Sequence, residues 1–450
     1  MKTNNNRPAS AAWAGANVDG ADSASAAGQE GVSTWESKLK ALGPGILMAS
    51  AAVGGSHIVA STQAGAMYGW QLAIVIVLAN LLKYPFFRFG YEYTLVTGES
   101  LLDGYARVGK KYVWLFFGLN VFSAMVNAGA VLIVCSAILK RFLGLQDAVF
   151  VGSRIEMSSM AFLSAVILLA SVSMLLAGKY GALDFASKAI MLSLTVATCA
   201  AALLAAKNGA QARLDAPAAS PWNWAALAFV VSLCGWMPAP IEISAISSLW
   251  LKAKRLAQKV SYKDGMFDFN VGFVGTALLA LVFMTMGWLV QYRSGEAIEL
   301  ANGSKYIAQL IHMYSSTIGP WSADLVAFIA FACMWGTTIT VLDGYSRSNV
   351  ESVRILLGRK TFSGRALSRW IVVTALVGFS IILFFNSAMS SLLKFAMIAS
   401  FVTTPVFAFL NFLLARRRLS APKWLMALAW AGLASLSGFA LFFVFTAFVV

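Results

Sequence analysis

The sequence predicts an all-α integral membrane protein with about 11 transmembrane helices, arranged as two inverted five-helix repeats in which helices 1 and 6 are broken. Three observations carry this prediction. The 450-residue chain has a mean hydropathy of +0.74 and only 12% charged residues, whereas soluble domains have about 25%. Apolar runs of about 20 residues recur along the chain, which is the length that a helix needs to cross a bilayer. Two of these runs are interrupted at matching places.

The N-terminal segment 1–36 differs from the rest of the chain. It is rich in Ala, Ser, Asn and Gly and contains no apolar run, so we expect a disordered cytoplasmic tail. The transmembrane domain is expected to occupy 37–450. Within it we place repeat one at about 45–206, repeat two at about 223–414 and an extra helix at 424–449.

The apolar runs define eleven spans, at roughly 45–69, 71–96, 112–139, 158–178, 183–206, 223–250, 267–292, 322–342, 368–386, 389–414 and 424–449. If the N-terminus is cytoplasmic, 22 of the 34 basic residues fall in the tail and the inner loops and 7 in the outer loops, as the positive-inside rule requires. We therefore expect a multi-pass protein of the plasma or inner membrane, embedded in the lipid bilayer, with its N-terminus inside and its C-terminus outside. Because topology accounts for the net charge of +15, no nucleic-acid partner is expected.

The two interrupted spans are the first and the sixth. Span 1 contains AAVGGSHIVASTQAGA from 51 to 66, where Gly54 and Gly55 lower the helix propensity. Span 6 reads FVVSLCGWMPAPIEISAISSLW, where Pro238 and Pro240 interrupt the helical hydrogen bonds. The two breaks are five spans apart, as two five-helix repeats would place them. Unwound backbone is tolerated in a membrane only where it is buried in protein or lines a cavity, and paired breaks point to a central binding site.

Several motifs resemble the Nramp family of divalent-metal transporters. They are GPGIL at 43–47, QAGAMYGW at 63–70, LAN at 78–80, Met237-Pro238, GTTITVLDGYSRSNV at 336–350 and SSLLKFAMIASFVTTPVFAFLNF at 390–412. The resemblance covers about residues 40–450. It implies the LeuT-like fold and a secondary transporter that works by alternating access.

The chain departs from this family at the residues that bind the metal. The family's Asp-Pro-Gly-Asn motif falls on Gly54-Gly55-Ser56-His57, so its carboxylate is absent. The family's Met-Pro-His becomes Met237-Pro238-Ala239, and the third span contains no carboxylate. We interpret the chain as a divergent branch that lacks the usual metal-binding residues, and we expect no metal site of that kind.

The altered breaks favour an anion as the substrate. The candidate substrate-binding residues are Gly54, Gly55, Ser56, His57, Met237, Pro238, Ala239 and Pro240. Half-helices that begin at the breaks present the positive ends of their dipoles, and hard divalent cations usually require carboxylates. We expect a small inorganic anion, with bicarbonate as the first candidate. The alternatives are a divalent cation (Mn²⁺ or Mg²⁺) held by carbonyls and Met237, and a membrane sensor that transports nothing.

Three further residues are candidates for coupling or for an outer vestibule: Glu242, Lys394 and Asn127. Glu242 either caps the helix that follows the break or titrates and couples transport to H⁺ or Na⁺. Lys83 and Arg88 are expected to snorkel or to form structural ion pairs. For His57, a purely structural role is the alternative to substrate binding. No nucleotide loop, catalytic triad or cluster of metal ligands is recognisable, so we expect neither an enzyme nor a cofactor.

Overall fold

The structure is a computed structural model that describes residues 34–145, 149–151, 156–178, 180–209, 219–295, 298, 303–385 and 388–449. Residues 1–33 of the expected disordered tail therefore lie outside the described residues. Its last residues were assigned wrongly, because a short helix begins at Trp35. Thr34 starts this helix with a capping box, in which its hydroxyl accepts from the Ser37 amide.

The described chain is almost entirely helical. Its elements are α2 (Trp35–Ala41), α3 (Pro44–Ala52), η1 (Gly55–Ser61), α4 (Thr62–Tyr68), η2 (Gly69–Leu72), α5 (Ala73–Thr97), α6 (Leu101–Val108), α7 (Lys110–Phe142), β1 (Val149–Val151), β2 (Glu156–Ser158), α8 (Ser159–Leu176), α9 (Tyr180–Asn208), α10 (Trp224–Trp236), α11 (Ile243–Ala257), α12 (Tyr262–Val290), α13 (Gly303–Ile318), α14 (Ser322–Leu356), α15 (Gly364–Phe384), α16 (Met389–Arg418) and α17 (Lys423–Val449). The antiparallel pair β1 and β2 is a small ribbon that an all-α expectation did not include.

Each of the eleven expected spans has a helical counterpart. Within the described residues, eight helical stretches are long and apolar enough to cross a membrane. The first of them, Pro44–Thr97, contains two expected spans that η2 joins. The fifth expected span corresponds to α9. The sixth corresponds to α10 and α11 together, and neither of these two helices is long enough by itself to cross a membrane. The protein is a multi-pass membrane protein.

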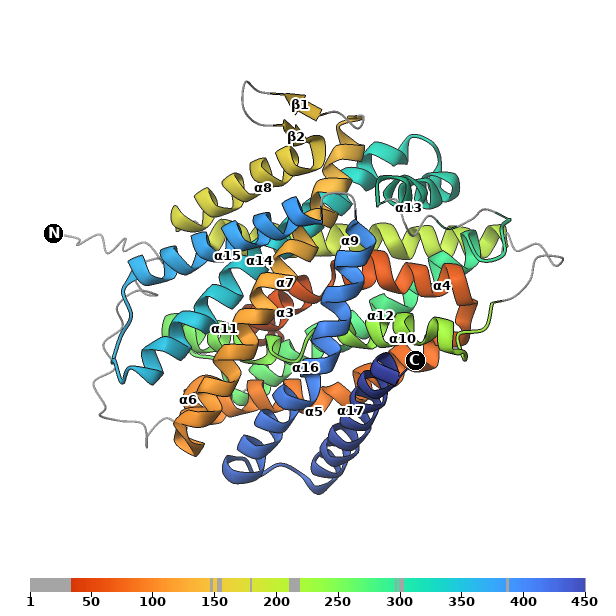
Figure 1. The fold of residues 1–450 in the computed structure, drawn as a ribbon. Helices are drawn as coiled ribbons and strands as arrows, with labels where there is room; N and C mark the ends of the chain where they lie inside the picture. The colour runs from red at the N-terminus through yellow and green to blue at the C-terminus, as the bar shows by residue number, and fades with distance from the viewer. Residues whose placement is uncertain are drawn as a thin grey trace.

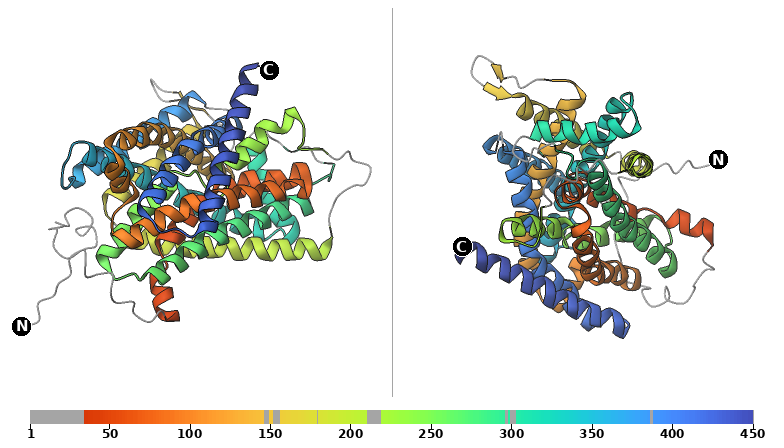
Figure 2. Two further views of the ribbon diagram at one scale, coloured as in Figure 1. Left: turned by 90° about the horizontal axis from the view of Figure 1, so that it is seen from below. Right: turned by 90° about the vertical axis from the view of Figure 1, so that its right-hand side faces the viewer.

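The helices surround a centre formed by α3, α7 and α14 (Figure 1). α7 packs along α14, and α15 and α16 lie against α7. α17 lies along one edge of the bundle in Figure 1 and in the right-hand view of Figure 2, and it packs against α5 and α16. Because α7 is mostly buried and α17 mostly exposed, the polar residues of α7 face protein, whereas α17 presents a large surface to lipid.

The short helix α3 is fixed against α12 by close backbone contact and by one carboxylate. A Cβ atom added to Gly272 would lie 2.3 Å from the carbonyl oxygen of Gly45, so glycine is required for this approach. Asp268 of α12 accepts hydrogen bonds from the amides of Gly43 (3.0 Å) and Gly45 (2.8 Å). This contact satisfies amides at the start of α3 and holds the N-terminal half of the first broken helix in place.

Candidate functional site

The first break follows Ala52, where α3 ends and the chain resumes at Gly55 in the wide turns of η1. The carbonyl oxygens on both sides of the break are already hydrogen-bonded. The Ala52 oxygen accepts from the Ser56 hydroxyl (2.5 Å), and the Val53 oxygen accepts from the Cys333 thiol (3.0 Å). The Gly54 oxygen accepts from the amides of two following residues. A cation at this point would therefore meet oxygens that other donors occupy.

The second break separates α10, which ends at Trp236, from α11, which begins at Ile243. The unwound segment, residues 237–242, contains Pro238 and Pro240, from which the break was predicted. In the described part of the chain, the backbone amides of Ala239 and Ile241 donate to no carbonyl. The second break thus offers free hydrogen-bond donors, which is the property that an anion requires.

Lys83 of α5 places its ammonium group at the second break. Its Nζ donates to the carbonyl oxygens of Cys234 (2.7 Å), Gly235 (2.9 Å) and Ala239 (3.3 Å), and its side chain has no exposed surface. The expectation that Lys83 snorkels or forms a structural ion pair was therefore wrong. The orphan carbonyls at the end of α10 attract the cation, and the helix is unwound there, so the ammonium can reach them.

A cavity of about 30 Å³ lies between the two breaks. It is bordered by α3, η1, α7, α10, the unwound segment, α11 and α14. Of the expected substrate and coupling residues, it brings together Gly55, Ser56, Pro238, Ala239, Pro240 and Asn127. A cavity needs at least about 10–15 Å³ to hold one water molecule, so this cavity admits water or a small ion.

Three of the expected substrate residues do not line the cavity: Gly54, His57 and Met237. Sequence reasoning also missed several residues that do, among them Trp236, Thr337 and Tyr345. Thr337 and Tyr345 belong to the GTTITVLDGYSRSNV stretch of α14. The run of hydroxyl side chains in an otherwise apolar span was the signal that could have identified them.

The imidazole of His57 is directed into the protein. Its Nε2 lies 2.9 Å from the carbonyl oxygen of Thr276 in α12, and its Nδ1 lies 2.7 Å from the Ser56 hydroxyl. The ring is completely buried and packs edge-on against Phe283. The arrangement corresponds to the structural alternative: Nε2–H donates to α12 and thereby fastens η1 to that helix.

Glu242, Asn127 and Tyr345 form a buried polar cluster beside the cavity. The Tyr345 hydroxyl donates to Glu242 Oε1 (3.1 Å), and Asn127 Nδ2 donates to the Tyr345 oxygen (3.1 Å). Glu242 occupies the N-cap position of α11, but its side chain makes no capping hydrogen bond, so the expected cap is not formed. Lys394 lies on the exposed side of α16 and does not border the cavity.

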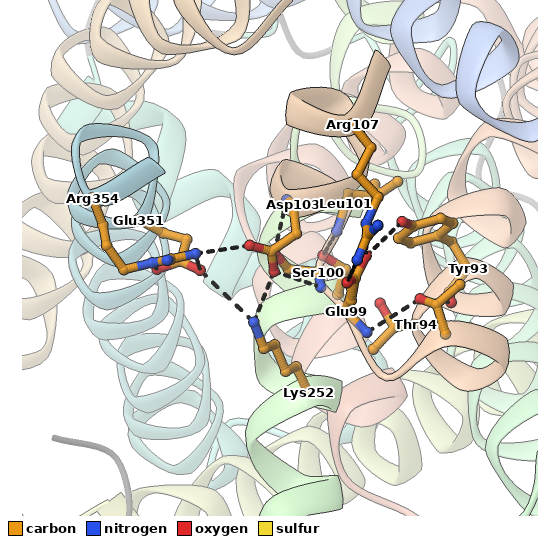
Figure 3. Close-up of polar contacts among 12 residues, drawn as sticks. Tyr93, Thr94, Glu99, Ser100, Leu101, Asp103, Arg107, Lys252, Glu351 and Arg354 are labelled. Atoms are coloured by element: carbon orange, nitrogen blue, oxygen red, sulfur yellow. Dashed lines mark hydrogen bonds and ion pairs between the residues drawn. The ribbon is translucent and has the colours of Figure 1, made fainter. Parts of the chain in front are cut away.

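A second polar cluster lies at the end of the bundle where α6, α11 and α14 meet. Asp103 of α6 accepts from Lys252 of α11 (2.7 Å) and from Arg354 of α14 (2.7 Å), and Arg354 also pairs with Glu351 (2.7 Å). Figure 3 shows Asp103 between these partners. Burial alone would raise the pKa of Asp103, but Lys252, Ser100 and Arg354 hold it below its ordinary value. The cluster connects α11, the helix that follows the second break, to α6 and α14.

Replacing Asp103 with Asn should lower the free energy of unfolding by about 2 kcal/mol, between the values for exposed and buried ion pairs. Because the pKa of Asp103 is lowered in the folded protein, its contribution is complete above the ordinary value of 3.8 and disappears as the pH falls below it. Thermal melting of the wild type and of Asp103→Asn in detergent should therefore differ at neutral pH and converge in acid. A difference that persists in acid contradicts this assignment.

The comparisons with known proteins place the chain in a family. It is 57% identical over 416 residues to the protein PM0681 of Pasteurella multocida, which covers 92% of this chain and 93% of that protein. The chain belongs to the same family as PM0681. No protein-family model matches it.

Solved structures identify the fold of this family. The manganese transporter of Eremococcus coleocola superimposes with a TM-score of 0.70 at 13% identity, over 92% of this chain and 88% of the transporter. Mhp1, a nucleobase-cation-symport-1 family transporter, superimposes with a TM-score of 0.57 at 14% identity, over 84% of this chain and 80% of Mhp1. The chain has the Nramp-type fold that its motifs predicted, and this fold is the LeuT-like arrangement of inverted repeats. At these identities the likeness concerns the fold alone.

Proposed function

We propose that the protein is a secondary transporter that carries a small inorganic anion by alternating access, with bicarbonate as the first candidate. The cavity between the two broken helices is the binding site in this proposal. The transporters that share the fold support the general class. Residues of both breaks line the cavity, and it has room for a substrate of a few atoms.

One observation carries the choice of an anion: the ammonium group of Lys83 occupies the carbonyl oxygens of the second break. A cation that used these carbonyl oxygens as ligands would have to displace this fixed charge or bind directly beside it. Like charges at a distance of about 4 Å repel by roughly 4 kcal/mol at an effective dielectric constant of 20. An anion is instead attracted by the same charge.

The groups that remain available at the cavity suit the same substrate. Ala239 borders the cavity and its amide is free, and the first residue of α11, Ile243, also lies on the cavity wall. The N-terminus of α11 therefore directs the positive end of its dipole toward the site. Gly55 and Ala239 have little or no side chain, so an anion can approach the backbone closely.

A divalent metal cation is the second candidate, because manganese transporters share the fold and Met237 retains a thioether at the break. Two facts weigh against it. Met237 does not line the cavity, and the described residues contain no group of three His, Cys, Asp or Glu side chains that could hold a metal. A sensor that binds its ion without transporting it is a third possibility, which a flux measurement separates from the first two.

Purified protein in proteoliposomes tests these alternatives. A bicarbonate gradient should change the internal pH, reported by a trapped dye, at least about tenfold faster than in protein-free vesicles, which correct for the passage of CO₂. A parallel preparation containing a dye that Mn²⁺ quenches should give no signal. Mn²⁺ entry without a bicarbonate effect would overturn the choice of an anion, and the absence of any flux would favour the sensor.

A further inference from the structure

The walls of the cavity conceal one positive and one negative group. Lys83 binds the carbonyl oxygen of Ala239, and Glu242 accepts from Tyr345; Ala239 and Tyr345 both line the cavity. Each charged side chain is at most 1% exposed. The other groups that face Glu242 are neutral: Asn127 and Ser123 of α7 and the Tyr345 hydroxyl of α14. With both side chains ionised, their two charges cancel.

This balance restricts how an anion can enter. Binding one anion beside Lys83 and Glu242 leaves one uncompensated negative charge in a buried site, and an uncompensated buried charge costs several kcal/mol. Neutrality is restored if one positive charge binds at Glu242 in the same step. A monovalent cation that binds together with the anion therefore keeps the site neutral.

Two oxygen atoms in the cluster have no hydrogen-bond partner and are available to bind such a cation. Glu242 Oε2 and Asn127 Oδ1 are buried and have no hydrogen-bond partner. Both belong to groups that contact the same Tyr345 hydroxyl, at 3.1 Å each. Buried acceptors are nearly always satisfied in folded proteins, so two unsatisfied oxygens on neighbouring members of one cluster point to a site that takes a ligand.

We propose that Glu242 Oε2 and Asn127 Oδ1 bind one Na⁺ ion, which the protein carries together with one anion in an electroneutral step. This inference rests on the proposed anion transport. Carboxylate and amide oxygens are suitable ligands for a hard cation. A proton is less suitable for bicarbonate, because HCO₃⁻ and H⁺ together equal CO₂ and water, and CO₂ crosses bilayers without a transporter.

The test measures labelled bicarbonate uptake into proteoliposomes at alkaline pH, with Na⁺ or choline outside and the membrane potential set by K⁺ and valinomycin. Wild-type uptake should rise at least about tenfold with Na⁺ and should not respond to the potential. In Glu242→Gln the negative charge is absent and Lys83 alone balances the bound anion, so the remaining uptake should be independent of Na⁺ and should respond to the potential. Asn127→Ala should require more Na⁺ for half-maximal uptake.

Glu92→Gln is the matched control, because Glu92 is also a buried carboxylate but pairs with Arg88 and Tyr262 away from the cavity. Its Na⁺ dependence should equal that of the wild type. Uptake that follows a pH gradient and ignores Na⁺, or a Glu242→Gln variant that keeps its Na⁺ dependence, overturns the Na⁺ site while anion transport stands.

A binding measurement separates this inference from the proposed function. Na⁺ should raise the melting temperature of the detergent-solubilised wild type more than choline does, because a ligand that binds only the folded state stabilises it. Glu242→Gln should lose this shift. If the shift is present but no bicarbonate flux occurs, the proposed substrate fails and the Na⁺ site stands; if the shift is absent, the Na⁺ site fails.

Discussion

Replacing Lys83 with Gln should reduce anion uptake at least about tenfold. The ammonium group is held at the second break by three hydrogen bonds to carbonyls. Opposite charges about 4 Å apart attract by roughly 4 kcal/mol at an effective dielectric constant of 20, and a loss of 1.4 kcal/mol is a factor of ten in an equilibrium constant. Glutamine can still donate hydrogen bonds to one or two of these oxygens. The substitution therefore removes the positive charge but keeps part of the local hydrogen bonding. The measurement is the initial rate of uptake against bicarbonate concentration.

Arg88→Gln is the appropriate control for Lys83→Gln. Arg88 lies on the same helix, is only partly buried, and pairs with Glu92 (3.1 Å) instead of the break. Its removal should leave uptake within about twofold of the wild type. Thermal melting of both variants checks that they are folded. A folded Lys83→Gln protein with wild-type uptake would show that the fixed charge does not attract the substrate.

Replacing Gly54 with Asp should abolish anion uptake, with a loss of at least about a hundredfold. A Cβ atom at Gly54 would lie 2.9 Å from Thr337 Oγ1 and 3.4 Å from Met334 Sδ, and Thr337 lines the cavity. The new carboxylate would therefore be close to the bound anion. Two negative charges about 4 Å apart repel by roughly 4 kcal/mol at an effective dielectric constant of 20, which alone exceeds a hundredfold effect.

Gly54→Asn separates the charge from the crowding. Asparagine has nearly the same size as aspartate and meets Thr337 in the same way, but it carries no charge. We expect Gly54→Asn to lose part of the uptake and Gly54→Asp to lose nearly all of it, measured in the same proteoliposome assay. Equal losses in both variants would assign the effect to packing and remove the electrostatic argument.

Much of the architecture follows from local sequence properties. Within the described residues, each span expected from hydropathy corresponds to a helix or to a pair of helices, because the bilayer requires long apolar helices. The breaks were also predictable: Gly54 and Gly55 lower helix propensity, and Pro238 and Pro240 cannot continue a helix. The terminal orientation and the boundaries of the repeats remain predictions.

The candidate site was predicted only in part. Gly55, Ser56 and the Pro238–Pro240 segment do border the cavity, because breaks in two packed helices leave space where they meet. His57 was placed in the site from its position in sequence, but its ring turns toward Thr276 of α12. The direction of a side chain depends on which helix lies beside it, and the sequence of one span does not contain that information.

The sequence by itself determined that the chain crosses the membrane many times and breaks two of its helices, because hydrophobicity and backbone propensity act over a few residues. Only the tertiary structure decided what the breaks contain. Lys83 and Cys234 are 151 positions apart, and Glu242 meets Tyr345 across 103 positions. A buried charge is defined by the groups that surround it in space, so the electrostatic character of the cavity was fixed when the helices packed together.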